Sequence, residues 1–334
     1  MDNLTHAMTG MLLSRAGLNR VAPRATLTLL LAANAPDIDI VTRGWGSLAY
    51  LRYHRGLTHS LAALPLLAAL VVAVMWLIGR RDPGGFRWGR TFLVALAGVA
   101  THPLMDLTNI YGIRPWLPFS NTWYSWDITF IVDIWLWIAL LAALVVPALG
   151  RLISGEIGAR PGSGTGAAVA ALVFLAGWWG ARDLLHRRAE AMLEAHLYGF
   201  NPAAASDPDA APAKPEGVAP LRVAAFPTPT NPLVWRGLVE TERFYQIVDF
   251  DVRRPLDPTA GRILYKPENA PALEAALRSP TAAAFSSFAR YPYATVDRRE
   301  EGYRVVLVDL RFPFRCTIDL DRQMRVVAER FTFS

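Results

Sequence analysis

The sequence predicts an α-helical integral membrane domain of about six helices, some of them short, followed by a small, mostly β domain outside the membrane. Of the 334 residues, 53% are apolar, and the mean hydropathy of +0.24 exceeds what a soluble domain usually carries. Several apolar runs approach the length that crosses hydrocarbon, about 20 residues. Near the C-terminus the pattern changes to the strict alternation typical of β-strands. We therefore expect two parts of different character in one chain.

The apolar runs define the expected helices of the first part. A helix rises about 1.5 Å per residue, so a run of about 20 residues spans the hydrocarbon core. Asp2 stands early and no basic residue precedes the first run, which is unlike a secretory signal peptide, so we expect a retained, short first helix. Four clear runs cover residues 60–78, 91–107, 128–149 and 167–181, and two weaker runs cover residues 4–18 and 26–41.

Composition also suggests where the parts of the chain meet. Eight prolines fall between residues 201 and 232, and such a stretch suits a linker or an irregular lead-in rather than regular structure. We expect a helical membrane domain at 1–185, a helix end and Pro/Ala-rich linker at 186–232, and a β-rich domain at 233–334.

In the β-rich part, alternating apolar and polar residues predict the strands. The stretch FRCTIDL alternates, so that Phe314, Cys316, Ile318 and Leu320 share one face of a strand. One helix, at 270–278, is expected to interrupt the strands, which we expect to pair mostly antiparallel.

Charge and cysteine usage narrow the function classes. The formal charge of +6 could suggest nucleic acid, but arginine-rich loops against anionic headgroups explain it in a membrane protein, and we expect no nucleic-acid partner. The single cysteine, Cys316, excludes an intrachain disulfide and a thiolate zinc cluster.

Ionisable residues stand inside or beside the apolar runs, where burying them unpaired costs several kcal/mol, on the order of 5. A lone histidine or aspartate at a helix end is usually a cap, and we interpret Asp127, His186 and His196 in that way. Seven such residues at the ends of successive runs favour a metal site instead, because imidazole and carboxylate are the ligands of catalytic zinc, manganese or iron. The seven are His6, Asp37, Asp39, His54, His59, His102 and Asp106.

Spacing supports shared coordination. His102 and Asp106 are four residues apart, so on a helix their side chains lie one turn apart, separated by about 40°. Asp37 and Asp39 follow Pro36, which ends or distorts the preceding helix, so we expect them on an irregular turn at a membrane edge.

The two histidines of YHRGLTHS are five residues apart and would face different ways on one helix. We therefore expect His54 in a loop and His59 at the first turn of the next helix, with Thr58 or Ser60 near its cap.

The arginines predict an orientation. If the first two runs form a hairpin and four crossings follow, all of the site residues fall on one side. The opposite loops carry eight arginines, against four in the loops on the site's side. The positive-inside rule then places the site and the β domain outside the cytoplasmic membrane. The eight are Arg20, Arg24, Arg80, Arg81, Arg87, Arg90, Arg151 and Arg160, and the four are Arg43, Arg52, Arg55 and Arg114.

These motifs carry a family resemblance. The stretches MDNLTHAMTG, APDIDI, YHRGLTHS, ATHPLMDLTNIYG with RPWLPFS, and WDITFIVD resemble the YdjM-like, LexA-regulated, membrane-bound metal-dependent hydrolases of bacteria. The likeness covers residues 1–140 strongly. The later NPLVWRGLVET is similar to the start of the C-terminal region in longer members.

The order His, Asp, His, His-x-x-x-Asp is also similar to zinc-dependent phospholipases C and single-strand nucleases. The chain lacks their downstream His…His-x-x-x-Glu set, because His186 and His196 have no such neighbours. We therefore expect one or two divalent ions rather than three, zinc first and manganese as the alternative.

The leading hypothesis is a membrane-bound metal-dependent hydrolase that acts on a phosphoester or lipid-related substrate at the bilayer surface. The metal would lower the pKa of bound water toward about 7. Asp37 or Asp39 would take the water proton, and Arg55 would meet a phosphate or carboxylate. Asp127 and Asp133 are candidates for orienting a ligand histidine.

Two other classes remain open. A transporter or non-catalytic metal-binding membrane protein would use the same carboxylates as an ion pathway, although transport sites usually lie near the midplane. An assembly or stress-response factor would use the metal for structure only. An open coordination position favours the enzyme, and a closed tetrahedral shell favours a structural role.

Overall fold

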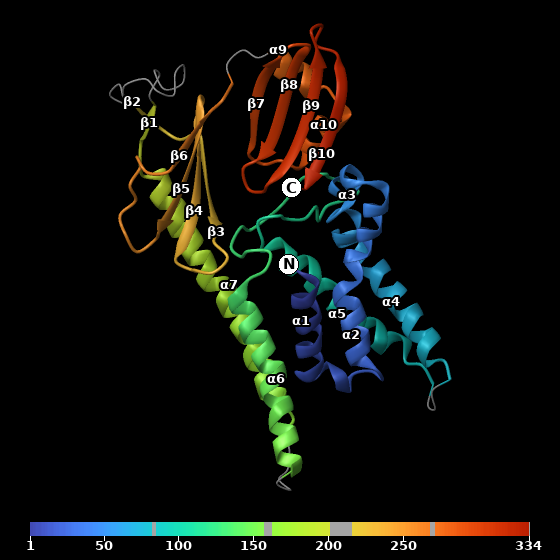
Figure 1. Cartoon of the computed structure of the whole chain (residues 1–334). Helices are drawn as coiled ribbons and strands as arrows, with labels where there is room; N and C mark the ends of the chain where they lie inside the picture. Colours follow the sequence, from blue (N-terminus) through green and yellow to red (C-terminus); the bar gives the residue numbers. More distant parts are fainter. Residues whose placement is uncertain (82–84, 157–161, 201–215, 268–270, 334) are drawn as a thin grey trace. The chain divides into compact units, whose positions relative to one another are not determined.

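The computed structural model of the chain describes residues 1–81, 85–156, 162–200, 216–267 and 271–333 (Figure 1). The chain divides into two compact units. The helical unit comprises Met1–Ile40, Arg55–Leu184 and Pro227–Pro232, and the β unit comprises Val41–His54, Leu185–Phe226 and Leu233–Ser334. The β unit thus contains a short piece of the N-terminal part, which we had expected to be helical throughout and to belong to one domain.

Helices make up the N-terminal part of the chain, as predicted. The α-helices are α1 (Asn3–Arg15), α2 (Ala25–Asn34), α3 (Ser47–Tyr53), α4 (Leu64–Gly79), α5 (Trp88–Leu107), α6 (Ile134–Glu156) and α7 (Thr165–Glu194). Short 3-10 helices join them: η1 (Leu18–Arg20), η2 (Ala35–Trp45), η3 (Leu57–His59) and η4 (Leu61–Ala63). The sequence had not predicted α3, which belongs to the β unit.

Three helical segments of the described chain are long and apolar enough to cross a membrane by length and composition: Leu61–Gly79, Ile134–Ser154 and Thr165–Glu194. Each overlaps a clear apolar run of the sequence, whereas the fourth clear run, 91–107, is not among these segments. By contrast α1 and α2 have 13 and 10 residues, which is shorter than the crossing length of about 20 residues.

The short helix α2 packs closely against α1 and α5 because glycines face it. A Cβ atom added at Gly10 of α1 would lie 2.8 Å from the carbonyl oxygen of Leu29, and one at Gly98 of α5 would lie 2.7 Å from the Cβ of Ala32. Small residues of this kind allow helix backbones to approach one another. The C-terminal end of α2 is therefore held against the C-terminal half of α5.

Pro36 determines how the chain leaves α2. Proline has no N–H to continue the helical hydrogen bonds, and α2 ends at Asn34 with the N–H of Ala35 bonded to the oxygen of Ala32. The chain continues as the 3-10 helix η2, whereas we had expected an irregular turn at Asp37 and Asp39. The tighter 3-10 turn brings both carboxylates into the interior of the helical unit.

The described part of the β unit contains two four-stranded sheets and one strand pair. The first sheet has the order β3-β4-β5-β6, the second has the order β10-β9-β8-β7, and β1 pairs with β2. Their bounds are β1 (Tyr198–Phe200), β2 (Glu216–Val218), β3 (Arg222–Pro227), β4 (Val234–Glu240), β5 (Phe244–Asp251), β6 (Arg262–Tyr265), β7 (Pro292–Arg299), β8 (Gly302–Asp309), β9 (Phe314–Asp321) and β10 (Val326–Phe333).

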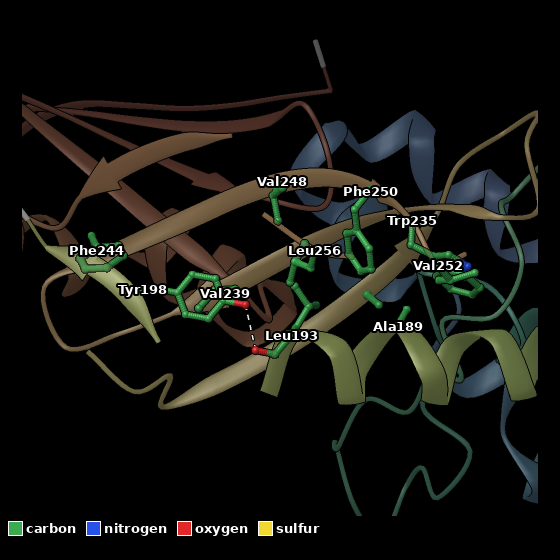
Figure 2. Close-up of a cluster of buried hydrophobic side chains, with 11 residues drawn as sticks. Ala189, Leu193, Tyr198, Trp235, Val239, Phe244, Val248, Phe250, Val252 and Leu256 are labelled. Atoms are coloured by element: carbon green, nitrogen blue, oxygen red, sulfur yellow. Dashed lines mark hydrogen bonds between the residues drawn. The ribbon is translucent and has the colours of Figure 1, made fainter. Parts of the chain in front are cut away.

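The last part of α7 supplies the core of the first sheet. Ala189 and Leu193 of this helix lie in one buried cluster with Trp235 of β4 and Phe244 of β5 (Figure 2). The hydroxyl of Tyr198 donates to the carbonyl oxygen of Leu193 at 2.8 Å, which satisfies the polar end of a fully buried ring. The helix therefore continues beyond residue 185 to Glu194, within the 186–232 segment where we had expected a helix end.

The second sheet follows the predicted alternation. Cys316, Ile318 and Leu320 of β9 are buried, and the rings of Phe285 and Phe288, from α10, contact the aromatic residues of β9 and β10. The helix predicted at 270–278 is α9 (Pro271–Leu277), and α10 (Pro280–Phe288) was not predicted.

The region expected to be a linker holds regular structure in its described part. Strand β2 and strand β3 lie within residues 216–227, and β3 joins the first sheet beside β4. The expectation of a linker to residue 232 was wrong there, because RVAAFP carries enough apolar residues between its prolines to form a strand. Residues 201–215 of the expected linker lie outside the described residues.

Candidate metal centre

Four side chains of the helical unit converge on one point. Asp37 comes from η2, His59 from η3, and His102 and Asp106 from α5. One ligand atom from each lies within 4.8 Å of the ligand atoms of the other three. The side chains of His59, His102 and Asp106 are completely buried, and that of Asp37 is 14% exposed. We call these four residues the four-donor group.

The distances within the four-donor group match a tetrahedron. The Nε2 atoms of His59 and His102 are 3.1 Å apart, and each lies 3.5 Å from Oδ1 of Asp37. Oδ2 of Asp106 lies 3.3 Å from the first nitrogen and 3.4 Å from the second. Metal–ligand bonds of about 2.0–2.1 Å around zinc give tetrahedral ligand–ligand distances of about 3.3 Å. Five of these distances therefore suit one small divalent ion.

Hydrogen bonding fixes the tautomer of His102. Its Nδ1 lies 2.6 Å from the carbonyl oxygen of Ala33, the last residue but one of α2. A carbonyl oxygen can only accept, so Nδ1 carries the proton. In the neutral ring Nε2 is then a bare lone pair, which is the form that binds a metal.

The tautomer of His59 is fixed by a relay of two groups. The hydroxyl of Thr58 donates to Oδ2 of Asp39 at 2.9 Å, so its oxygen is left to accept from Nδ1 of His59 at 3.1 Å. The proton of this ring is therefore also on Nδ1. The two Nε2 atoms that face each other across 3.1 Å both present lone pairs.

Such an arrangement could hold a metal ion. Two nitrogen lone pairs and two carboxylate oxygens face one another, and three of the four side chains are fully buried. Oδ2 of Asp106 has no hydrogen-bond partner among the described residues. Buried charges without a partner are strongly unfavourable, and a divalent ion at the centre would satisfy all four donors. The residues present therefore fit the metal that the sequence predicted.

Arg55 secures Asp106 from the other side. Its guanidinium lies 3.1 Å from Oδ1 of Asp106 and donates to Oδ1 of Asn109 at 2.9 Å, over the ring of Tyr111. The N-terminal ammonium of Met1 also pairs with Oδ1 of Asp106. Since Arg55 is 4% exposed and directed inward, its predicted role as a substrate anchor has no support from these contacts and remains a prediction.

His6 lies against the four-donor group without being one of its members. Its ring stacks on that of His102 at 3.7 Å, and its Nε2 lies 3.4 Å from Oδ1 of Asp106. Neither of its ring nitrogens has a hydrogen-bond partner among the residues that the structure describes. Its predicted role as a ligand remains a prediction.

The other predicted site residues are not members of the four-donor group. His54 belongs to the β unit, where it ends α3 and its ring stacks on Tyr50. Asp133 accepts from the backbone N–H groups of Trp135 and Leu136 and so caps α6. It also accepts from the indole of Trp178 at 3.1 Å.

Asp127 has a local contact as well, since it accepts from the hydroxyl of Ser125 at 2.8 Å. Neither Asp127 nor Asp133 has a described contact with a ligand histidine, so the predicted orienting role of these two residues is unsupported. Asp39, predicted as a ligand, is not in the four-donor group and lies behind His59 instead.

Two supporting residues were missed by sequence reasoning. Asn109 binds Arg55 and also accepts from the backbone N–H of Tyr111, and Thr58 relays between His59 and Asp39. Asn109 lies beyond the end of α5 at Leu107, so helix spacing from Asp106 could not have indicated it. Thr58 had been considered only near a cap. Ser60 is the residue that fills this role, because it accepts from the N–H of Ala63.

Comparison with known proteins places these residues in a family. Residues 1–187 match the YdjM inner membrane protein family, which is more than half of the chain and includes the whole four-donor group. The chain belongs to the YdjM inner membrane protein family. The resemblance carried by the sequence motifs is thereby confirmed.

A second match concerns the other end of this YdjM family member. Residues 271–333, which hold α9, α10 and β7 to β10, match the YfhP C-terminal alpha/beta plait domain. The uncharacterized protein YfhP of Bacillus subtilis is 30% identical over 154 residues, covering 44% of this chain and 46% of the relative. The chain thus spans about half the length of this curated relative. No solved structure matches the chain.

Proposed function

We propose that this YdjM family member is a membrane-bound metal-dependent hydrolase that acts on a phosphoester or a lipid-related substrate at the membrane surface. The observation that carries the proposal is the four-donor group, with two imidazole nitrogens and two carboxylate oxygens at 3.1–3.5 Å. A divalent ion there, zinc first and manganese as the alternative, supplies Lewis acidity that lowers the pKa of water and polarises the bond attacked.

The chain's own residues divide the remaining tasks. His59 and His102 would hold the ion through Nε2, and Asp106, fixed by Arg55, would hold it through Oδ2. Asp37 is the most exposed member of the four-donor group, so substrate and water approach from its side. Oδ1 of its carboxylate would hold the ion, and the other oxygen is the one we assign to take the proton of the attacking water.

The substrate assignment depends on location. The family is one of inner membrane proteins, and three helical segments have the length and composition to cross a membrane. We infer a multi-pass protein of the bacterial cytoplasmic membrane, with the site and the C-terminal domain on the periplasmic side, as the arginine distribution predicts. A compartment-sensitive reporter fused after Ser334 tests this inference, and a cytoplasmic signal would contradict it.

A direct test is a substrate screen with the purified protein. Phosphodiesters, phospholipids and peptides are offered with added zinc or manganese to the wild type, to His59→Ala and to a control, His196→Ala. The Nδ1 atom of His196 is hydrogen-bonded to the carbonyl oxygen of Met192, and the residue is not in the four-donor group. The proposal expects metal-dependent turnover that His59→Ala abolishes and His196→Ala retains. Turnover that survives in His59→Ala would contradict it.

One observation favours a second candidate, a metal-binding membrane protein without turnover. Four protein donors fill a tetrahedron, and three of them are completely buried, which is typical of structural zinc sites. In that case the protein would bind its ion stoichiometrically, lose thermal stability on chelation, and hydrolyse none of the substrates. The same screen, with melting curves before and after chelation, distinguishes the two candidates.

A further inference from the structure

We propose that Asp39 is a positioning residue for His59 and not a ligand of the ion that the four-donor group would hold. Asp37 and Asp39 are two residues apart on η2 and would then have different tasks on opposite sides of the His59 ring. The inference rests on the proposed metal site and assigns work to a carboxylate next to it.

Contacts of Asp39 show how it is held. A single oxygen, Oδ2, accepts from the backbone N–H of Arg55 at 2.9 Å and from the hydroxyl of Thr58 at 2.9 Å. The same oxygen lies 3.4 Å from Nδ1 of His59. The side chain of Asp39 is only 5% exposed. Its carboxylate is therefore held by these protein donors rather than by water.

The two nitrogens of His59 face opposite aspartates. Nε2 lies 3.5 Å from Asp37, whereas Nδ1 faces Thr58 and Asp39. An ion bound to Nε2 lies on the side of the ring away from Nδ1. Asp39 therefore faces the back of the ligand and not the ion.

A carboxylate behind the Nδ1 side of a ligand histidine affects how that histidine binds a metal. When the far N–H of a ligand imidazole donates toward a carboxylate, the ring is held in one tautomer and one orientation, and its ligand nitrogen becomes more basic. Here the donation passes through the hydroxyl of Thr58, which needs Asp39 as its acceptor. Loss of such partners typically lowers metal affinity by about 10–100-fold, while loss of a ligand removes the binding position itself.

The experiment measures metal binding to the full chain, purified in detergent. Cobalt(II) and zinc(II) affinities are obtained by competition with a chelator for the wild type, Asp37→Asn, Asp39→Asn and Thr58→Val. Asp127→Asn is the matched control, since Asp127 is a buried aspartate that accepts a hydrogen bond from Ser125, two residues before it. The cobalt(II) absorption spectrum and the ¹⁵N signals of the histidine rings report ligand set and tautomer independently of any activity.

We expect Asp39→Asn and Thr58→Val to bind one ion per chain with affinity lower by about 10–100-fold, a cobalt(II) spectrum of the same ligand number, and a changed Nδ1 signal for one histidine. Asp37→Asn should lose the wild-type spectrum, and Asp127→Asn should match the wild type. The inference is overturned if Asp39→Asn loses its ion as completely as Asp37→Asn, or if it binds like the wild type. A wild-type protein that binds no ion would overturn the proposed function itself.

Discussion

Two arginine–aspartate pairs, one in each unit, show how differently the same chemistry is used. In the β unit, Arg304 and Asp319 face each other across β8 and β9 with nitrogen–oxygen distances of 2.7 and 3.0 Å, and their side chains are 43% and 34% exposed. In the helical unit, Arg55 and Asp106 are 3.1 Å apart and are 5% and 0% exposed. The first pair is solvated on a sheet surface, and the second is enclosed with histidines and another aspartate.

The difference in solvent exposure indicates which of the two pairs is expected to belong to a functional site. An exposed ion pair contributes about 0–1 kcal/mol, and losing it changes little. A buried pair is no better for stability than apolar residues of similar volume, but breaking it leaves a charge without a partner. Groups that are retained despite such a cost are expected at functional sites. We therefore interpret the enclosed pair of the helical unit as support for the ion that the four-donor group is proposed to hold.

Removing one carboxylate from each pair should give the largest contrast. Asp106→Asn leaves the charge of Arg55 buried and removes a metal ligand, so we expect about 3–5 kcal/mol of lost unfolding free energy and loss of the bound ion. Asp319→Asn should cost at most about 1 kcal/mol and leave metal content unchanged. Denaturant unfolding in detergent and elemental analysis measure both quantities. Equal losses in the two variants would remove the distinction between the pairs.

A methyl group at the contact between α2 and α5 should have an intermediate effect. Gly98→Ala places a Cβ 2.7 Å from that of Ala32, and such overpacking costs about 1–3 kcal/mol. Because His102 follows one turn later on α5, metal affinity should fall as well. Gly177→Ala on α7 is the control, since nothing lies within 4 Å of its added Cβ, and alanine there should be neutral or stabilising by up to about 1 kcal/mol. The packing argument fails if the two variants behave alike.

The smallest effect concerns a partly buried carboxylate of the β unit. Burial acts to raise the pKa of Glu240, but hydrogen bonds from Lys266, Tyr245 and Arg222 lower it below its ordinary value of 4.5. A carboxylate with a lowered folded-state pKa stabilises the protein above the unfolded-state pKa, and that contribution is lost as pH falls through the folded-state pKa.

The stabilising effect of Glu240 should therefore be visible near neutral pH and disappear in acid. Melting temperatures of the wild type and Glu240→Gln should differ at pH 7 and converge as pH falls below about 4. A difference that is constant over this range would contradict the pKa argument.

The sequence predicted the side-chain positions that depend on the periodicity of a single helix or strand. His102 and Asp106 approach each other because they lie one turn apart on α5, and the buried face of β9 follows from strict alternation. Three of the six predicted apolar runs likewise overlap the three described segments that have the length and composition to cross a membrane. In each case the periodicity of a helix or strand is sufficient to place the side chains.

Contacts between residues on different helices or strands could not be predicted from the sequence. The division of work between Asp37 and Asp39 depends on where the ring of His59 arrives from a different 3-10 helix, and no spacing rule relates η2 to η3. The inward direction of Arg55 depends on Asn109, which is 54 residues away in sequence. Strand β3 was not predicted because we assigned the whole segment 201–232 to a linker from its proline content. The apolar residues of the strand itself were given less weight.

Metal stoichiometry of the purified wild-type protein, compared with that of His102→Ala, tests the central claim most directly. After loading with zinc or manganese and removal of free ion, elemental analysis should give one ion per chain for the wild type and none for His102→Ala, with His186→Ala retaining its ion as the control. A wild-type protein without bound metal, or one ion per chain in His102→Ala as well, would contradict the account.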